Sequence, residues 1–207
     1  MLYLSVILAY ALCSIPTAVW IGKYFYGVDV REHGSGNAGA TNVLRTLGKK
    51  AGISVLFFDM LKGFAAVNLS WLTDFSQGSD EWTNVRSVLA LAAIIGHIFP
   101  VFANFRGGKG VATMTGTLIA INPFAALIAI VFFFLMLLMT KYVSLSSVTT
   151  ALTLPVVFGA WLQSGFALNM FSFAVALIIL ITHRQNIKRL MKGQESKTDL
   201  FGRKENG

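Results

Sequence analysis

The sequence predicts an all-α, polytopic integral membrane protein, a seven-transmembrane-helix bundle with Gly-rich loops at its cytoplasmic end. Two observations predict this fold class. Hydrophobic residues make up 55% of the 207 residues and charged residues only 13%, whereas a soluble domain carries about 25% charged residues. Apolar stretches of about 17–22 residues also recur, and these are long enough to cross a hydrocarbon core about 30 Å thick. We expect residues 1–207 to form a single membrane-embedded domain, with a frayed polar tail from about residue 198.

Seven apolar segments are the candidate spans. The first has no basic N-terminal region and no small-residue cleavage site after it, so we interpret it as a retained span with a kink at Pro16 rather than a signal peptide. Asn122–Pro123 divides the long apolar region 111–140 into a short span and a full one, because proline favours a turn there. A five-span interpretation stays open. The seven segments are at about 2–22, 52–72, 86–104, 111–121, 124–140, 145–163 and 169–182.

The basic residues predict how this bundle is oriented. With seven spans, all 17 Lys and Arg residues except Lys62 and Arg86 fall on one side of the membrane. Cytoplasmic loops carry the excess of Lys and Arg, so we expect the N-terminus outside and the C-terminus in the cytoplasm. The net charge of +8 is then explained by orientation and by anionic headgroups, and nucleic acid is not predicted as a partner. Cys13, within the first span, is interpreted as an inert apolar filler.

Three polar segments interrupt the apolar chain, at residues 34–52, 96–113 and 183–197. They contain almost all of the Gly-rich turns, histidines and clustered basic side chains. The predicted orientation puts all three in the cytoplasm, where they could meet around one charged ligand. Phosphate is the ligand that exposed backbone N–H groups, helix N-termini and basic side chains suit together.

The first polar segment begins Gly34-Ser-Gly-Asn-Ala-Gly-Ala-Thr-Asn-Val-Leu-Arg45. The glycine spacing matches a dinucleotide-binding fingerprint, but that fingerprint needs a preceding strand and is rejected here. The simpler alternative is a Gly/Asn turn with a helix N-cap at Thr41, which needs only one or two such polar residues. We favour an anion site, in which Arg45 can bind two phosphate oxygens. Its backbone and short polar donors are Gly34, Ser35, Gly36, Asn37, Gly39, Thr41 and Asn42.

The second polar segment contains Gly107-Gly-Lys-Gly110. It looks like part of a nucleotide-binding loop, but no Ser or Thr follows the lysine, so ATP binding is not predicted. We expect Gly107, Gly108 and Gly110 to fold over a small anion, with Lys109 as a point charge. His97 is interpreted as a packing residue near the end of a span. Arg106 either anchors that span to headgroups or shares in the site.

The third polar segment follows the last apolar segment. His183 and Asn186 are three residues apart, so on a helix they share a face. The basic residues Lys188, Arg189 and Lys192 are explained as membrane anchors. Anchoring does not explain the presence of a histidine, an asparagine and Glu195.

Two further groups of polar residues lie in or next to predicted spans. Asp59 and Lys62 are three residues apart inside the second span, where isolated charges are costly. They either pair with each other or share in the site. Ser144, Ser146 and Ser147 lie at another cytoplasmic boundary and could offer a hydroxyl to the same cavity.

Together the three polar segments resemble the bacterial acyl-phosphate–glycerol-3-phosphate acyltransferase family. Its patterns G-S-G-N-x-G-A-T-N-x-x-R, G-H-x-F-P…F-x-G-G-K-G-V-A-T and H-R-x-N-I-x-R-L…G-x-E occur here in that order. Arg106 stands where Lys is common. The resemblance implies that a fatty acyl group moves from acyl phosphate to the sn-1 hydroxyl of glycerol 3-phosphate. The implied products are lysophosphatidic acid and inorganic phosphate, in the first step of phospholipid synthesis at the bacterial cytoplasmic membrane, with no cofactor and no metal.

Acyl phosphate is already activated, so positioning and charge stabilisation would supply most of the catalysis without a Ser or Cys nucleophile. We assign the first polar segment to acyl phosphate and the second to glycerol 3-phosphate. We favour the substrate phosphate as the base, with His183 as the alternative. A transporter for a small phosphorylated metabolite is the rival hypothesis. The expected catalytic residues are Ser35, Arg45, Lys109, His183 and Asn186, and the expected binding residues are Gly34, Gly36, Asn37, Gly39, Thr41, Asn42, Gly107, Gly108, Gly110 and Ser144.

Overall fold

The structure, a computed structural model, describes residues 1–198, and the predicted frayed tail lies from residue 199 onward outside the described residues. Within that range the chain forms ten α-helices joined by short turns. The helices are α1 (Leu2–Cys13), α2 (Thr17–Tyr26), α3 (Ala40–Leu47), α4 (Lys49–Asn68), α5 (Asp80–Ile98), α6 (Val111–Ile121), α7 (Pro123–Thr140), α8 (Val143–Val156), α9 (Phe166–Thr182) and α10 (Arg184–Met191). The 3₁₀ turns are η1 (Val30–Glu32), η2 (Leu69–Leu72) and η3 (Val101–Ala103), and a π-helical turn, η4 (Val157–Trp161), continues α8.

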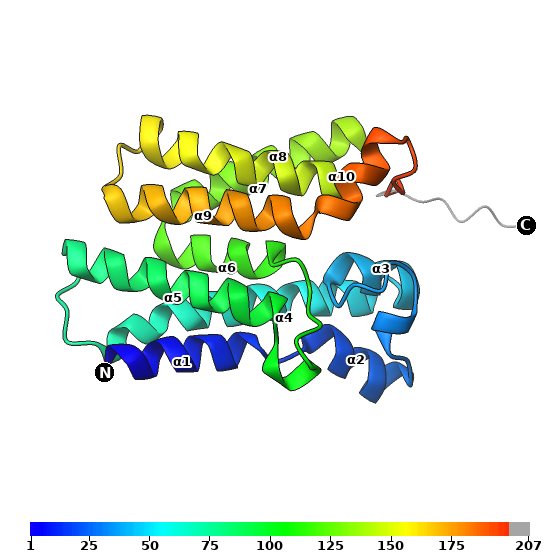
Figure 1. Ribbon diagram of the computed structural model, residues 1–207, viewed down its shortest axis with the longest axis horizontal. Helices are drawn as coiled ribbons and strands as arrows, with labels where there is room; N and C mark the ends of the chain where they lie inside the picture. Colours follow the sequence, from blue (N-terminus) through cyan, green and yellow to red (C-terminus); the bar gives the residue numbers. More distant parts are fainter. Residues whose placement is uncertain (199–207) are drawn as a thin grey trace, which may run out of the picture.

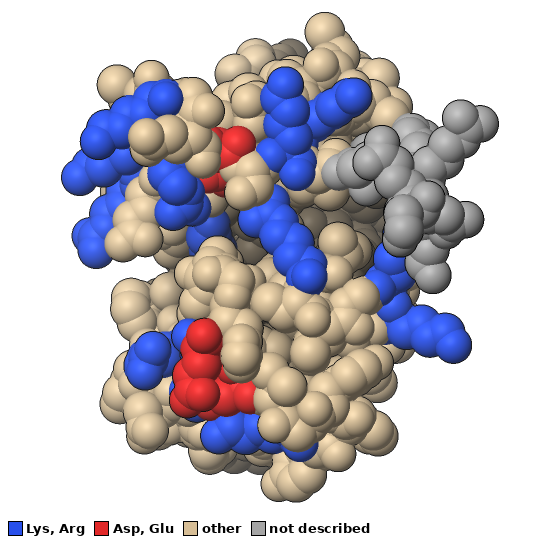
Figure 2. Space-filling model, turned by 90° about the vertical axis from the view of Figure 1, so that its right-hand side faces the viewer, with Lys and Arg blue, Asp and Glu red and all other residues tan. Residues whose placement is uncertain are grey.

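The long helices run side by side along the length of the molecule (Figure 1). One group consists of α1, α4, α5 and α6, and a second of α7, α8 and α9. The groups are joined where α6 packs against α7 and α5 packs against α9. The short helices α2, α3 and α10 lie together at the end opposite the N-terminus. Lys and Arg side chains gather on the face at that end (Figure 2).

The predicted class, an all-α integral membrane bundle, is confirmed. Among residues 1–198, five helical segments are long and apolar enough to cross a membrane, and α9 with α10, bent by 61°, makes a sixth candidate. α6 is apolar but has only 11 residues. Each of the seven apolar segments predicted from the sequence is helical, but their number as spans, seven, stays a prediction. The five segments are Leu2–Tyr26, Lys49–Leu72, Asp80–Ala103, Pro123–Thr140 and Val143–Trp161.

Prolines set two of the helix boundaries. Pro16 was expected to kink one continuous helix, but α1 ends at Cys13 and Pro16 is the N-cap of α2. Proline has no N–H with which to continue a helix, so the chain breaks there. The predicted division at Asn122–Pro123 is confirmed, because the Asn122 side chain caps α7 by accepting a hydrogen bond from the Ala125 N–H at 2.9 Å.

Glycines bring α4 and α6 close together. A Cβ at Gly116 would overlap the backbone carbonyl of Met60, and a Cβ at Gly63 would overlap that of Thr113. Small residues let membrane helices approach until their backbones touch. The start of α6 is therefore held against the middle of α4.

A hydrogen bond from Arg31 ties the connector after α2 to the loop after α5. Arg31 pairs with Asp29 at 2.7 Å and donates a hydrogen bond to the Ala103 carbonyl at 3.2 Å. Lys23 lies 3.2 Å from the same carboxylate. The hydrogen bond from Arg31 holds the pKa of Asp29 well below its usual range. These contacts hold the chain just before the first polar segment against the second polar segment.

Candidate active site

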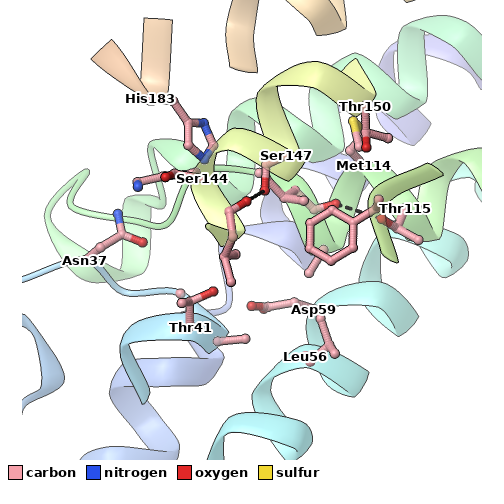
Figure 3. Close-up of a pocket in the computed structure, with 18 of the residues that line it drawn as sticks. Asn37, Thr41, Leu56, Asp59, Met114, Thr115, Ser144, Ser147, Thr150 and His183 are labelled. Atoms are coloured by element: carbon pink, nitrogen blue, oxygen red, sulfur yellow. Dashed lines mark hydrogen bonds between the residues drawn. The ribbon is translucent and has the colours of Figure 1, made fainter. Parts of the chain in front are cut away.

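A cavity of about 370 Å³ lies where the three polar segments meet. The cavity has a polar part beside these segments and an apolar part that runs between α4, α6, α7 and α8 (Figure 3). The structure therefore brings together residues that are far apart in the sequence, as the sequence predicts. The expected residues on its wall are Ser35, Asn37, Gly39, Thr41, Asn42, Arg45, Lys109, Gly110, Ser144, His183 and Asn186. The apolar wall includes Leu56, Met60, Met114, Ala129, Ile130, Phe133 and Phe134.

Three helices begin at the wall of this cavity. The N-caps of α3, α6 and α8 are Gly39, Gly110 and Tyr142, and none of them supplies a side-chain cap. The first N–H groups of each helix have no acceptor within the helix, and the helix dipole adds partial positive charge. Three such N-termini around one cavity are an arrangement that favours a bound anion. The alternative N-cap at Thr41 is wrong, because Thr41 lies inside the first turn of α3 and on the cavity wall.

Asn42 shapes the first polar segment. Its Oδ1 accepts hydrogen bonds from the Ser35 N–H at 2.8 Å and the Ser35 hydroxyl at 3.1 Å. Its Nδ2 donates to the carbonyls of Val30 at 2.8 Å and His33 at 3.1 Å. Asn42 was expected to donate to substrate, but both of its N–H groups are already bound to backbone. Its role is to hold the turn that presents Ser35.

Gly34 and Gly36 were expected to bind substrate, but neither residue lines the cavity. Both have left-handed backbones, with φ of +62° and +69°, a conformation that glycine adopts without strain. A Cβ at Gly34 would overlap the Asn42 side chain, and the Gly36 N–H donates to the His33 carbonyl at 3.0 Å. These two glycines make the turn, so Gly39 is the glycine of this segment that faces the cavity.

Gly107 and Gly108 are also off the main cavity wall, which corrects a second expectation. Their N–H groups donate to the carbonyls of Ile98 and His97, each at 3.2 Å. A Cβ at Gly108 would overlap the His97 ring. Their small size lets the loop fold back on the end of α5. That fold carries Lys109 and Gly110 to the cavity, and Arg106 is not on its wall.

Lys109 provides a partly desolvated cation. Its ammonium donates a hydrogen bond to Asn186 Oδ1 and has two further N–H bonds for other acceptors. Burial lowers the pKa of Lys109 to about 8, because the charged form loses solvation. The carboxylate of Glu195 opposes this shift, while Arg189 and Arg45 add to it.

Glu195 holds the third polar segment together. Its Oε1 accepts hydrogen bonds from Asn186 Nδ2 at 2.6 Å and the Ser144 hydroxyl at 2.7 Å, and its Oε2 accepts one from Arg189 Nε at 2.7 Å. Burial would raise the pKa of Glu195, but these hydrogen bonds outweigh it and lower the pKa. Glu195 was not among the expected site residues. The sequence did offer one indication of its role, because membrane anchoring does not explain a glutamate at position 195.

These contacts refine the roles of two residues. Both ends of the Asn186 amide are bound, to Lys109 and to Glu195, so the geometry favours Asn186 as a residue that positions Lys109. Arg189, interpreted from the sequence as an anchor, also pairs with the Glu195 carboxylate at 2.7 Å.

The chain after α10 is hydrogen-bonded to two other parts of the polar end of the bundle. Arg45, which is exposed, donates to the Ser196 carbonyl at 3.3 Å. The Thr198 N–H donates to the Lys141 carbonyl at 2.8 Å. This segment links α3 to the start of α8 and holds the Arg45 guanidinium beside the site.

His183 is buried just after α9. Its Nδ1 lies 2.9 Å from the Ile179 carbonyl. A carbonyl can only accept, so the hydrogen must be on Nδ1, and the neutral ring then keeps a lone pair on Nε2. His183 therefore offers the cavity a hydrogen-bond acceptor.

Asp59, Lys62 and His97 form a buried charged group beneath the polar segments. Lys62 Nζ lies 2.8 Å from Asp59 Oδ1, and His97 Nδ1 lies 3.7 Å from the same oxygen. Lys62 also donates to the Ile15 carbonyl at 3.0 Å. Asp59 and His97 both line the cavity. The expected pairing of Asp59 with Lys62 is confirmed. Asp59 also lies on the cavity wall, and a share in the site stays a prediction.

Comparison with known proteins gives consistent matches over nearly the whole chain. The family profile described as glycerol-3-phosphate acyltransferase matches residues 3–193. Glycerol-3-phosphate acyltransferases of Staphylococcus aureus strains JH9 and Newman are 40% identical over 200 residues, which covers 95% of this chain and 98% of theirs.

Two crystal structures are similar in fold. Both are of PlsY (YgiH), an integral membrane glycerol 3-phosphate acyltransferase, and both are 36% identical to this chain. Its glycerol 3-phosphate form has a TM-score of 0.87 and covers 97% of this chain and 99% of its own. Its lysophosphatidic acid form has a TM-score of 0.83 and covers 96% of this chain and 95% of its own.

Proposed function

The chain belongs to the glycerol-3-phosphate acyltransferase family, and from that premise we propose that its acyl donor is a fatty acyl phosphate. The acyl group moves to the sn-1 hydroxyl of glycerol 3-phosphate, giving lysophosphatidic acid and inorganic phosphate. One observation carries the proposal. A single cavity combines a cationic part rich in N–H donors with an apolar part among the helices. The glycerol 3-phosphate and lysophosphatidic acid forms of the similar structures support this acceptor and product.

The charges on the wall suit two phosphate groups. Each phosphate monoester carries close to two negative charges near neutral pH. Lys109, Arg45 and the N-termini of α3, α6 and α8 supply opposing charge. Preorganised donors of this kind stabilise charge that develops during acyl transfer. No nucleophilic side chain is required, because the mixed anhydride is already activated.

The reaction is a direct acyl transfer. The sn-1 oxygen attacks the carbonyl carbon and forms the ester bond, while the bond from that carbon to the phosphate oxygen breaks. Inorganic phosphate leaves with the bonding electrons. We assign acyl phosphate to the first polar segment and glycerol 3-phosphate to the loop of Lys109. A substrate phosphate takes the proton of the sn-1 hydroxyl, and His183 Nε2 orients that hydroxyl.

The proposed setting is the cytoplasmic membrane of a bacterium. Cytoplasmic loops of membrane proteins carry more Lys and Arg, and the basic face in Figure 2 supports a cytoplasmic site with the N-terminus outside. Residues 1–207 act as one domain in this proposal. The rival, a phosphate-metabolite transporter, would place its binding groups near the bilayer midplane, whereas the polar segments here gather at one end.

The test is an assay of the detergent-purified protein with palmitoyl phosphate. We expect release of inorganic phosphate and formation of lysophosphatidic acid only when glycerol 3-phosphate is added. Palmitoyl-coenzyme A in place of palmitoyl phosphate is the matched control and should give no product. Absence of phosphate release with both substrates present would overturn the proposal, as would efficient use of the coenzyme A ester alone.

A further inference from the structure

The carboxylate of Asp59 has unused capacity to accept hydrogen bonds. Its side chain is almost completely buried, with a residue exposure of 1%, and it lies on the cavity wall across from Ser144 and Ser147 (Figure 3). Lys62 Nζ lies 2.8 Å from Oδ1 and His97 Nδ1 lies 3.7 Å from the same oxygen, whereas Oδ2 has no hydrogen-bond partner among residues 1–198. Buried carboxylate oxygens normally have such partners, so the free Oδ2 is open to a donor from a ligand.

The rest of the polar wall leaves few strong acceptors for a substrate. Glu195 is the other carboxylate that lines the cavity among the described residues, and its oxygens are bound to Ser144, Asn186 and Arg189. The Asn186 oxygen is bound to Lys109. Asp59 therefore provides a free carboxylate oxygen on a wall whose other polar groups mainly donate hydrogen bonds.

Glycerol 3-phosphate brings hydroxyl donors as well as a phosphate. The sn-1 hydroxyl attacks the acyl group, and the sn-2 hydroxyl is a second donor that must be satisfied once water is excluded. The proposed mechanism gives His183 Nε2 to the sn-1 hydroxyl. One strong acceptor, on α4, is then available for the sn-2 hydroxyl.

We propose that Asp59 accepts a hydrogen bond from the sn-2 hydroxyl of glycerol 3-phosphate and so selects this acceptor over phosphorylated alcohols that lack the hydroxyl. This inference rests on the proposed function. The ion pair with Lys62 explains how a carboxylate can share the site with two phosphates, because the pair has no net charge. An ion-paired carboxylate accepts hydrogen bonds well but is a poor proton acceptor. Asp59 therefore holds the sn-2 hydroxyl without competing for the proton of the sn-1 hydroxyl.

The probe is 3-hydroxypropyl phosphate, which keeps the phosphate and the reacting hydroxyl but lacks the sn-2 hydroxyl. The deciding variant is Asp59→Leu with Lys62→Met, because replacing both members of a buried ion pair by apolar residues of similar volume is usually tolerated. The matched control is Asp59→Asn with Lys62→Met. It also lacks both charges but keeps an acceptor oxygen at position 59.

We expect wild-type kcat/KM to favour glycerol 3-phosphate over 3-hydroxypropyl phosphate by about 10- to 100-fold, the range for a hydrogen bond to a charged group. The ratio should fall to about 3-fold or less in the Leu/Met variant and take an intermediate value in the Asn/Met variant. A wild-type ratio kept in the Leu/Met variant overturns the inference. Equal losses of kcat/KM with glycerol 3-phosphate and with 3-hydroxypropyl phosphate also overturn it, because they indicate a structural or base role of Asp59. If the Leu/Met variant is not recovered folded, the Asn/Met variant decides, and an unchanged ratio overturns the inference.

Binding separates this inference from the proposed function. The Kd values of glycerol 3-phosphate and 3-hydroxypropyl phosphate, measured by calorimetry on the same proteins without acyl donor, should show the same pattern of ratios. If the protein binds glycerol 3-phosphate but transfers no acyl group from acyl phosphate, the proposed function fails. The role of Asp59 is then decided by the binding ratios alone.

Discussion

The ammonium of Lys109 donates a hydrogen bond to the side-chain oxygen of Asn186, which lies 77 residues further along the chain. This contact joins the loop before α6 to the start of α10. Asn186 in turn donates to Glu195 at 2.6 Å. A chain of polar contacts therefore connects the cation in the cavity to a carboxylate on the cavity wall.

The Lys109 charge predicts an alkaline limit to substrate binding. With a pKa of about 8, Lys109 is charged below that pH and loses its charge as the pH rises through it. kcat/KM, which reports the free enzyme, should fall above about pH 8, whereas kcat should fall less because bound phosphate keeps the lysine charged. The measurement is a pH–rate profile with each phosphate substrate varied. In Lys109→Arg the fall should move out of the accessible pH range, and an unchanged fall would assign it to another group.

Removal of either cation should be costly. Arg45→Ala and Lys109→Ala should each lower kcat/KM by at least about 100-fold, because each removes a charged partner of a phosphate or of the developing oxyanion. Lys49→Ala is the matched control, since Lys49 is exposed at the start of α4 and does not line the cavity. Steady-state kinetics that show the same loss for all three variants would mean that only overall charge matters.

The carboxylate of Glu195 should act on activity through the charge of Lys109. Glu195 raises the pKa of Lys109, so Glu195→Gln should move the alkaline fall in kcat/KM to lower pH. Ser144→Ala removes one hydrogen bond to Glu195 but keeps the charge of the Glu195 carboxylate. That variant should lose activity, but its alkaline fall in kcat/KM should stay at the wild-type pH. The two pH–rate profiles measured side by side are the test. Identical alkaline limbs in both variants would show that Glu195 serves only to hold the fold.

The apolar part of the cavity should set the acyl-chain preference. Ala129 is buried on α7 and lines this part, so Ala129→Leu should shorten the space for the chain. Each buried methylene contributes about 0.8 kcal/mol, and the ratio of kcat/KM for palmitoyl phosphate over lauroyl phosphate should fall by at least about 10-fold. Leu127→Ala, on the exposed face of the same helix, should leave the ratio unchanged. Competition assays with the two donors measure it, and an unchanged ratio in Ala129→Leu would locate the acyl chain elsewhere.

His183 distinguishes the two candidate bases. If a substrate phosphate takes the proton, His183→Gln should keep kcat within about 10-fold of wild type, because the amide can still hydrogen-bond the hydroxyl. A general base contributes about 100-fold or more. A loss of that size, together with loss of the acidic limb of the kcat profile, would identify His183 as the base.

The sequence by itself determined the fold class and the three segments that meet. Composition and apolar segment length require a helical membrane bundle, because backbone polar groups in lipid must be satisfied within each helix. The motifs with Arg45, Lys109 and His183 indicated a phosphate site, since residue type and local spacing carry that information. The N-cap at Asn122 and the ion pair of Asp59 with Lys62 are local as well and could be predicted from spacing.

Only the tertiary structure decided which of these residues face the cavity. Gly108 and Asn42 belong to the same motifs as Lys109 and Arg45, yet Gly108 packs against His97 and the Asn42 amide is bound by its own loop. Glu195 gained its place because α8 and α10 bring Ser144 and Asn186 to the same carboxylate. The physical reason is that a hydrogen bond between segments distant in the sequence depends on helix packing and side-chain direction, and neither is specified by local pattern.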